Sequence, residues 1–178
     1  MSEQRKILGE ERRQLLLSIL KDQGTPVKGG ELAERTNVSR QVIVGDISLL
    51  KAKNEPIIAT SQGYLYMKDK PSEVYERTVA CIHSPEETKE ELNILVDHGV
   101  VIKDVSVEHP VYGDLTATLR ISNRKEVEDF VQQVTSKKAS YLLELTGGIH
   151  MHTITAKNEN HLQEAVEALG ERGFLADE

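Results

Sequence analysis

Two histidines separated by one residue, His150 and His152, lie in the apolar stretch Ile149 to Ala156. Because side chains alternate between the two faces of a β-strand, both imidazoles are expected to project from the same face. That spacing lets two nitrogen ligands reach one metal ion. It also suits two ordinary strand histidines, since imidazole is intermediate in burial and binds metals only in company. The pair therefore indicates a metal site only if other ligands converge on it.

Two further candidate ligands precede the pair. His83 ends the apolar stretch Thr78 to His83, and the next residues, Ser84-Pro-Glu-Glu87, are typical of a helix start. Glu91 falls two turns along that helix, at the edge of its apolar stripe, where an unpaired carboxylate would be partly desolvated. Three imidazoles and one carboxylate suit zinc, nickel or iron better than calcium or magnesium. The alternative is that Glu91 is a solvated helix residue.

One predicted loop combines three polar residue types. The segment His109-Pro-Val-Tyr-Gly-Asp114 follows a predicted strand and offers an imidazole, an aromatic face and a carboxylate. Such a loop suits a small-molecule site, and His109 and Tyr112 are then the candidate contacts. A plain turn is the alternative interpretation. Cys81 is expected to be a small buried hydrophobe rather than a ligand.

Composition limits the class of protein. A single cysteine among 178 residues excludes an intrachain disulfide framework. The chain lacks both a signal-peptide pattern and an apolar stretch of the roughly 20 residues that span a membrane, which predicts a cytoplasmic protein. Residues 1–70 contain 12 Lys and Arg against 9 Asp and Glu, whereas residues 71–178 contain 10 against 20. This asymmetry predicts two parts with different functions.

The first part is predicted to form three helices and a hairpin. The helices are expected over Glu10–Gln23, over Gly30–Thr36, and from Ser39 to about Lys53, and a short turn joins the second to the third. This is the connection of a helix-turn-helix unit. Residues Ile57 to Met67 are predicted to form two short strands around a Ser-Gln-Gly turn. A hairpin at that position would be the wing of a winged helix.

Four residues at the start of the third helix are candidate DNA contacts. Ser39 is the expected N-cap, and Arg40, Gln41 and Val44 point away from the apolar position Ile43. In a helix-turn-helix unit this end enters the major groove. Arg matches the edge of guanine, Gln that of adenine, and Val can contact a thymine methyl group. The alternative is a solvated helix face.

The second part is predicted to be an α+β domain. The polar segment Lys68–Ser72 contains a proline and indicates a boundary between domains 1–70 and 71–178. We expect a sandwich-like arrangement in which a mainly antiparallel sheet carries helices on one face. The strands are predicted over Thr78–His83, Val100–Val107, Leu115–Ile121, Leu142–Leu145 and Ile149–Ala156, and the helices over Ser84–Asp97, Arg124–Thr135 and Leu162–Leu169.

Residues Glu31 to Leu50 resemble the winged helix-turn-helix domains of bacterial repressors. They share the inward alanine, the Val-Ser turn, the Arg-Gln pair and the Asp-Ile pair in the same order. Gly45 departs from the pattern, since many such domains have a basic or long polar residue there. Glycine inside a helix costs roughly 1 kcal/mol relative to alanine, but it permits close approach to a phosphate backbone.

The segments around Glu108–Gly113, Leu145–Ile154 and His83–Glu91 together resemble the three-histidine domain of the niacin-responsive, NiaR-type repressors of NAD biosynthesis. The resemblance implies a homodimeric repressor of NAD biosynthesis or niacin uptake genes, which binds double-stranded operator DNA and takes nicotinate as co-repressor. It also implies a transition-metal site, with nickel or zinc held by His83, Glu91, His150 and His152. The chain is then not an enzyme. The alternatives are a metalloenzyme acting on a pyridine compound and a metal-sensing repressor without an organic ligand.

Overall fold

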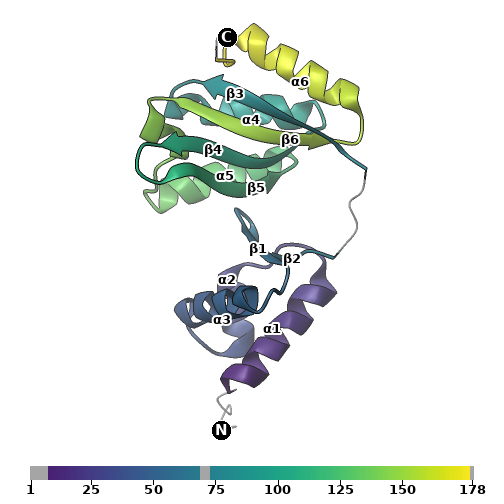
Figure 1. Cartoon of the computed structure of the whole chain (residues 1–178), viewed down its shortest axis with the longest axis vertical. Helices are drawn as coiled ribbons and strands as arrows, with labels where there is room; N and C mark the ends of the chain where they lie inside the picture. The colour runs from purple at the N-terminus through teal and green to yellow at the C-terminus, as the bar shows by residue number, and fades with distance from the viewer. Residues whose placement is uncertain (1–7, 69–72, 177–178) are drawn as a thin grey trace. The chain divides into compact units, whose positions relative to one another are not determined.

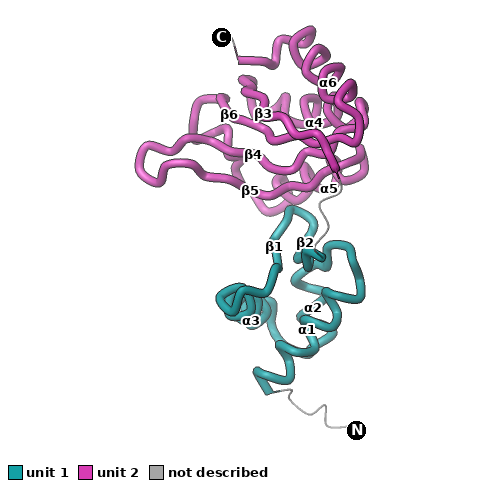
Figure 2. The backbone as a smooth tube through the Cα atoms, turned by 45° about the vertical axis from the view of Figure 1, so that its right-hand side comes forward, with its two compact units in different colours: residues 1–70 teal, residues 71–178 magenta. Residues whose placement is uncertain are grey.

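The computed structural model describes residues 8–68 and 73–176. The chain divides into two compact units, unit 1 with residues 1–70 and unit 2 with residues 71–178 (Figure 2). Most of the predicted linker Lys68–Ser72 lies outside the described residues. Across the described ranges, each helix is too short or too polar to cross a bilayer.

Unit 1 has the predicted order of elements. Helices α1 and α2 are followed by α3, which Ser39 caps by accepting a hydrogen bond from the Val42 backbone N–H at 3.4 Å. Asn37 ends α2 with a positive φ of 52°, so the chain turns tightly between the two helices. The bounds are α1 Gly9–Gln23, α2 Gly29–Thr36, α3 Arg40–Ala52, β1 Ile57–Thr60 and β2 Gly63–Tyr66.

The wing, which is the hairpin of β1 and β2, is hydrogen-bonded to the segment that precedes α2. Val27 and Tyr64 exchange two backbone hydrogen bonds of 2.8 Å, so Val27 lies beside β2 as a third short extended segment. Gly63 has a φ of 132°, and a β-carbon there would lie 2.4 Å from the Val27 carbonyl oxygen. A glycine is therefore required at the start of β2, where the wing passes close to the backbone of Val27.

Unit 2 contains one four-stranded sheet in the order β3-β6-β4-β5, with antiparallel pairing throughout. Its elements are β3 Tyr75–Ile82, the 3-10 helix Pro85–Glu87, α4 Thr88–Asp97, β4 Val101–His109, β5 Gly113–Ile121, α5 Arg124–Ser136, the 3-10 helix Leu142–Thr146, β6 Ile149–Ala156 and α6 Glu159–Arg172.

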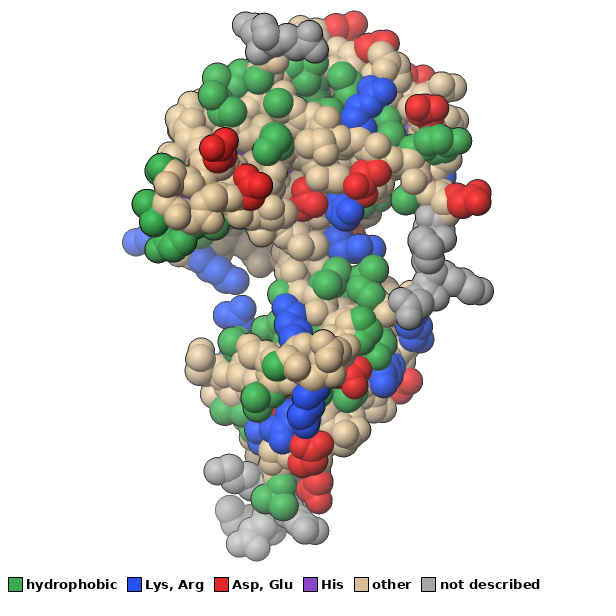
Figure 3. All heavy atoms as spheres, in the orientation of Figure 1, with side chains coloured by type: hydrophobic (Ala, Val, Ile, Leu, Met, Phe, Trp, Pro, Cys, Tyr) green, Lys and Arg blue, Asp and Glu red, His purple; other side chains and the backbone are tan. Residues whose placement is uncertain are grey.

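The three long helices of unit 2 cover one face of the sheet (Figure 1). Alternate residues of the strands, such as Ile154 of β6, pack there against Leu92, Val127 and Leu169 of α4, α5 and α6. The other face, seen in Figure 3, carries scattered apolar, acidic and basic side chains among uncharged polar ones. The predicted α+β fold, with helices on one face of an antiparallel sheet, is confirmed.

Two local predictions were wrong. Leu142–Leu145 is part of a 3-10 helix rather than a strand, and it ends at Gly147 with a φ of 65°. A short leucine-rich run has no period that separates a strand from a helical turn. In α1, the helical spacing of Leu15, Leu16, Ile19 and Leu20 predicts that all four face inward. Leu15 is instead 36% exposed, and Leu17 is buried.

Candidate functional site

Three elements of unit 2 bring the four predicted metal ligands together. His150 and His152 project from the helix-covered face of β6, as the alternation predicted, and both are 2% exposed. His83 follows β3, the neighbour of β6 in the sheet. Glu91 comes from the buried face of α4 and is 0% exposed. His83 and His152, which are 69 positions apart in the sequence, thus meet at one point.

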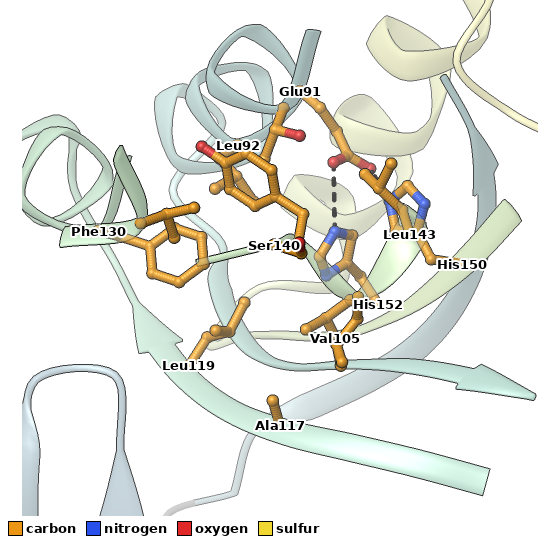
Figure 4. A pocket seen from close by; sticks show the side chains of 14 residues that line it. Glu91, Leu92, Val105, Ala117, Leu119, Phe130, Ser140, Leu143, His150 and His152 are labelled. Carbon is orange, nitrogen blue, oxygen red and sulfur yellow. Dashed lines mark hydrogen bonds and ion pairs between the residues drawn. The ribbon is translucent and has the colours of Figure 1, made fainter. Parts of the chain in front are cut away.

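The Glu91 carboxylate is the centre of this cluster. Its Oε2 lies 2.7 Å from His83 Nε2 and 3.3 Å from His152 Nε2, and its Oε1 lies 3.0 Å from His150 Nε2. Figure 4 shows Glu91 directed from α4 toward His150 and His152. All three histidines therefore present the same ring nitrogen to one carboxylate.

The other ring nitrogen of each histidine is held by the backbone. The Nδ1 of His83, His150 and His152 lies 2.8–2.9 Å from the carbonyl oxygen of Ser84, Gly148 and Asp104 respectively. A carbonyl oxygen only accepts hydrogen bonds, so each Nδ1 carries a proton. In a neutral imidazole, Nε2 then has a free lone pair, which is the state of a metal-binding histidine oriented by its surroundings.

The donor atoms and the charge of this cluster suit a bound cation. A lone pair on Nε2 facing a carboxylate oxygen is repulsive, and protonating all three imidazoles would bury three positive charges around one negative charge. The 2.7 Å contact of His83 Nε2 also lacks hydrogen-bond alignment, which leaves this buried nitrogen without a hydrogen-bond partner among the described residues. Three nitrogen donors and one carboxylate fit a first-row transition-metal ion.

The electrostatics of the cluster follow from burial and charge. Burial works to raise the pKa of Glu91, but the three imidazoles, led by the charge of His152, outweigh it and hold this pKa well below 4.5. Burial works to lower the pKa of His83 and of His152, yet their contacts with Glu91 raise both above 6.5. The carboxylate is therefore ionised and ready to bind a cation.

Cys81, which was predicted to be a small buried hydrophobe, is buried and lies beside the cluster. Its Sγ, a Glu91 carboxylate oxygen and a His150 ring nitrogen lie within 4.8 Å of one another. Burial and the neighbouring carboxylate raise the pKa of the Cys81 thiol, so the sulfur carries its proton. The sequence indicates this position, because Cys81 is two residues before His83 and shares a face with it in the predicted strand Thr78–His83.

A cavity of about 250 Å³ adjoins the cluster. We call it the ligand cavity; Glu91, His150 and His152 form part of its wall. The rest is mainly apolar (Figure 4). Its remaining lining residues are Thr88, Leu92, Val105, Ala117, Leu119, Phe130, Val134, Ser140, Tyr141, Leu142 and Leu143. These residues cannot be identified as ligand contacts from the sequence, because they belong to five different elements and the loop before the second 3-10 helix, and most look like ordinary core positions.

His109 and Tyr112 lie elsewhere. They form the turn between β4 and β5, where His109 Nδ1 accepts hydrogen bonds from the backbone N–H groups of Val111 and Tyr112 at 3.1 and 3.2 Å. Tyr112 is 75% exposed. Neither residue lines the ligand cavity. The His109 imidazole thus stabilises the turn in which it lies.

In unit 1 the candidate DNA contacts share one exposed face of α3. Arg40, Gln41 and Val44 are exposed, whereas Ile43 and Ile47 on the opposite side are buried. The Arg40 side chain lies beside Gly29, since a β-carbon on that glycine would lie 3.3 Å from Arg40 Nε. The exposed N-terminal end of the second helix of the helix-turn-helix is the part that enters a major groove.

A buried carboxylate holds α3 against α1. Asp46 is 4% exposed and accepts hydrogen bonds from Arg12 Nε at 2.5 Å and from Arg12 Nη2 at 3.2 Å. Arg13 Nη1 adds a contact of 3.3 Å to the same carboxylate. This network cannot be predicted from the sequence, because nothing in the spacing shows that residues 12 and 46 meet.

A winged helix-turn-helix unit, joined to a separate unit with a buried three-histidine cluster, defines a DNA-binding protein of two units. Family comparisons agree: residues 12–65 match a helix-turn-helix (HTH) domain, and residues 76–178 match the 3H domain. The chain is 54% identical over 178 residues to the transcription repressor NadR of Bacillus subtilis, with 98% of each chain covered. It is 42% identical over 173 residues to the probable transcription repressor NiaR of Thermotoga maritima, covering 97% of this chain and 98% of that protein.

The chain belongs to the NadR/NiaR family of transcription repressors. The resemblance found in the sequence is therefore confirmed, as are the helix-turn-helix domain and its binding to DNA. The metalloenzyme alternative is set aside, because these relatives are named as repressors and carry a DNA-binding domain.

Proposed function

We propose that this protein represses genes of NAD biosynthesis or niacin uptake, with nicotinate as co-repressor bound beside a metal ion in unit 2. The metal would be held by His83, Glu91, His150 and His152. The observation that carries the proposal is the convergence of three backbone-oriented Nε2 atoms on the buried Glu91 carboxylate at one end of the ligand cavity.

The size and walls of the ligand cavity favour a single aromatic ring. An apolar cavity of about 150 Å³ holds benzene, so 250 Å³ has room for one ring with a substituent. Leu92, Leu119 and Phe130 supply apolar contacts for the ring faces. This observation favours an organic ligand over a sensor that responds to metal alone.

The charges around the ligand cavity indicate that an anionic ligand needs a bound metal ion. None of the lining residues is a lysine or arginine, and the charged group in the wall is the Glu91 carboxylate. An anionic ligand would be repelled there unless a cation neutralised that charge. A bound divalent ion would supply the fixed positive charge for the carboxylate of nicotinate. We therefore expect nicotinate to bind only the metal-loaded protein and nicotinamide to bind more weakly.

Repression requires that ligand binding favour the DNA-competent state. A coupling of about 1–3 kcal/mol would raise operator affinity roughly 5- to 150-fold. We propose a homodimer, because two winged helices related by a two-fold axis would recognise the two halves of a palindromic operator. Sedimentation of the metal-loaded protein, alone and with operator DNA, tests the dimer directly.

An operator titration tests the co-repressor role. The metal-free protein, the protein with Ni²⁺ or Zn²⁺ alone, and each with nicotinate are compared on one double-stranded operator. We expect the largest affinity with metal and nicotinate together. Equal affinity in all four conditions would exclude nicotinate as co-repressor. A full response to metal alone would instead identify a metal sensor.

A further inference from the structure

We propose that the Thr88 hydroxyl hydrogen-bonds to the ring nitrogen of the bound ligand and thereby selects a pyridine carboxylate over a benzene carboxylate. This inference rests on the proposed function, since it places nicotinate in the ligand cavity. It goes beyond that function because it pairs the ring nitrogen of the ligand with the side chain of Thr88.

Thr88 combines burial with an unused hydrogen-bonding group. The residue is 5% exposed, and its Oγ1 has no hydrogen-bond partner among the described residues. It lines the ligand cavity. A buried hydroxyl without a partner is unfavourable, so such a group in the wall of a cavity is expected to serve a ligand.

The position of Thr88 relative to Glu91 suits the shape of nicotinate. The two residues are one turn apart on the buried face of α4, so their side chains are neighbours on one wall of the ligand cavity. The nitrogen of nicotinate is meta to the carboxylate, which keeps the two polar groups on one side of the ring. With the carboxylate at the cation site beside Glu91, the ring extends along α4 and its nitrogen faces the Thr88 hydroxyl, which donates.

The other hydroxyl groups of the ligand cavity differ from Thr88. Ser140 is exposed, so water can satisfy its hydroxyl. Tyr141 is partly buried, and its ring lies 6.0 Å from that of Phe130 between centroids, which makes it an aromatic wall. Among the described residues, Thr88 Oγ1 is therefore the hydroxyl of the cavity wall that is buried and has no hydrogen-bond partner.

Calorimetric titration of the metal-loaded full chain with nicotinate and with benzoate provides the test. Benzoate keeps the ring and the carboxylate but lacks the nitrogen. We expect the wild type to bind nicotinate at least about 10-fold more tightly than benzoate, because benzoate leaves the hydroxyl unpaired. In Thr88→Val, which has nearly the same shape, this ratio should fall below about 3-fold. Thr88→Ser, which retains the hydroxyl, should keep most of the selectivity.

Two controls separate the possible explanations. Tyr141→Phe removes the hydroxyl of the partly buried tyrosine in the cavity wall. Loss of selectivity in this variant instead of in Thr88→Val would overturn the inference. Metal content and thermal unfolding of each variant are measured to confirm that the site is intact. Thr88→Val removes an unpaired buried polar group, so no loss of stability is expected.

The outcomes distinguish the two proposals. If Thr88→Val weakens both ligands equally, the hydroxyl contacts the carboxylate and the inference is wrong. If the wild type binds nicotinate and Thr88→Val leaves the ratio unchanged, the inference fails while the proposed function stands. If the metal-loaded wild type binds neither acid, the proposed function itself fails.

Discussion

Gly148 lies against the backbone of His83. A β-carbon on Gly148 would lie 2.6 Å from the His83 carbonyl oxygen, and the glycine has a φ of 106°. Its own carbonyl oxygen accepts a hydrogen bond from His150 Nδ1 at 2.9 Å and one from the His83 backbone N–H at 3.4 Å. One residue without a side chain thus fixes two of the predicted ligands relative to each other.

Replacing Gly148 by alanine should disrupt the metal site. The clash with backbone and the positive φ force β3 and β6 to shift, so we expect lower metal affinity and a stability loss of about 2 kcal/mol or more. Gly147→Ala is a matched control, because Gly147 also has a positive φ, of 65°, but has open space around it. That variant should lose only about 1 kcal/mol and keep its metal. Thermal unfolding and metal analysis of both variants check the contrast; equal loss in both would contradict it.

Metal binding should stabilise the protein more as the pH rises. Folding lowers the pKa of Glu91, so its contribution to metal-free stability is present above 4.5 and lost as the pH falls through the lowered value. Folding raises the pKa of His83 and His152, so their contributions are present below 6.5 and lost as the pH rises through the raised values. The metal-free protein is thus favoured in a mildly acidic window, whereas metal binding requires unprotonated Nε2 atoms.

The measurement is the difference in melting temperature between protein with Ni²⁺ and protein with a chelator, from about pH 5 to about pH 8. We expect this difference to grow across the range, because protons compete with the metal in acid. His150→Ala, which removes one ligand, should abolish most of it at every pH. A difference that stays constant with pH in the wild type would show that the metal binds elsewhere.

Removing the Asp46 carboxylate should loosen α3 from α1. Asp46→Ala leaves two arginines without their buried partner, which typically costs about 3–5 kcal/mol. We expect lower stability of unit 1 and weaker operator binding, without a change in the metal content of unit 2. Chemical denaturation followed by circular dichroism, together with metal analysis, checks this. Glu31→Ala is the control, since its pair with Arg35 is exposed and should contribute less than about 1 kcal/mol.

Replacing Gly45 should have opposite effects on the stability of the protein and on its affinity for operator DNA. It is exposed within α3, and a β-carbon there would meet nothing within 4 Å. Gly45→Ala should therefore stabilise the protein by up to about 1 kcal/mol, while weakening operator binding if the backbone approaches DNA closely at this point. Gly30→Ala in α2 has equally open surroundings and should stabilise without affecting operator affinity. A gain in operator affinity for Gly45→Ala would argue against close backbone approach.

The base contacts proposed for α3 predict a change in specificity. Arg40→Ala and Gln41→Ala should each cost about 1–3 kcal/mol on the preferred operator and relax the preference at particular base pairs. Ser48→Ala, on the exposed side of the same helix but about two turns away from its start, should leave specificity unchanged. Binding to a set of single-base operator variants measures this. A uniform loss on all sequences would reassign Arg40 and Gln41 to phosphate contacts.

Much of this protein follows from its sequence because the signals are local. The positions of α1, α2, α3 and the wing follow from periodicity, the Ser39 cap and the glycine turns, which act within a few residues. Strand alternation also placed His150 and His152 on one face of β6, as the structure shows. The run Leu142–Leu145 was mistaken for a strand because a short apolar run has no informative period.

Only the tertiary structure decided which distant groups meet. The contacts of Glu91 with His83, His150 and His152, the closeness of Cys81, and the Arg12–Asp46 pair depend on sheet order and helix packing, which no single segment encodes. The ligand cavity is likewise formed where six elements approach one another: α4, β4, β5, α5, the 3-10 helix Leu142–Thr146 and β6. A linear sequence also cannot show that the Thr88 hydroxyl lacks a hydrogen-bond partner among the described residues. Local spacing therefore determined the elements and the ligand types, whereas long-range packing determined their convergence on one buried carboxylate.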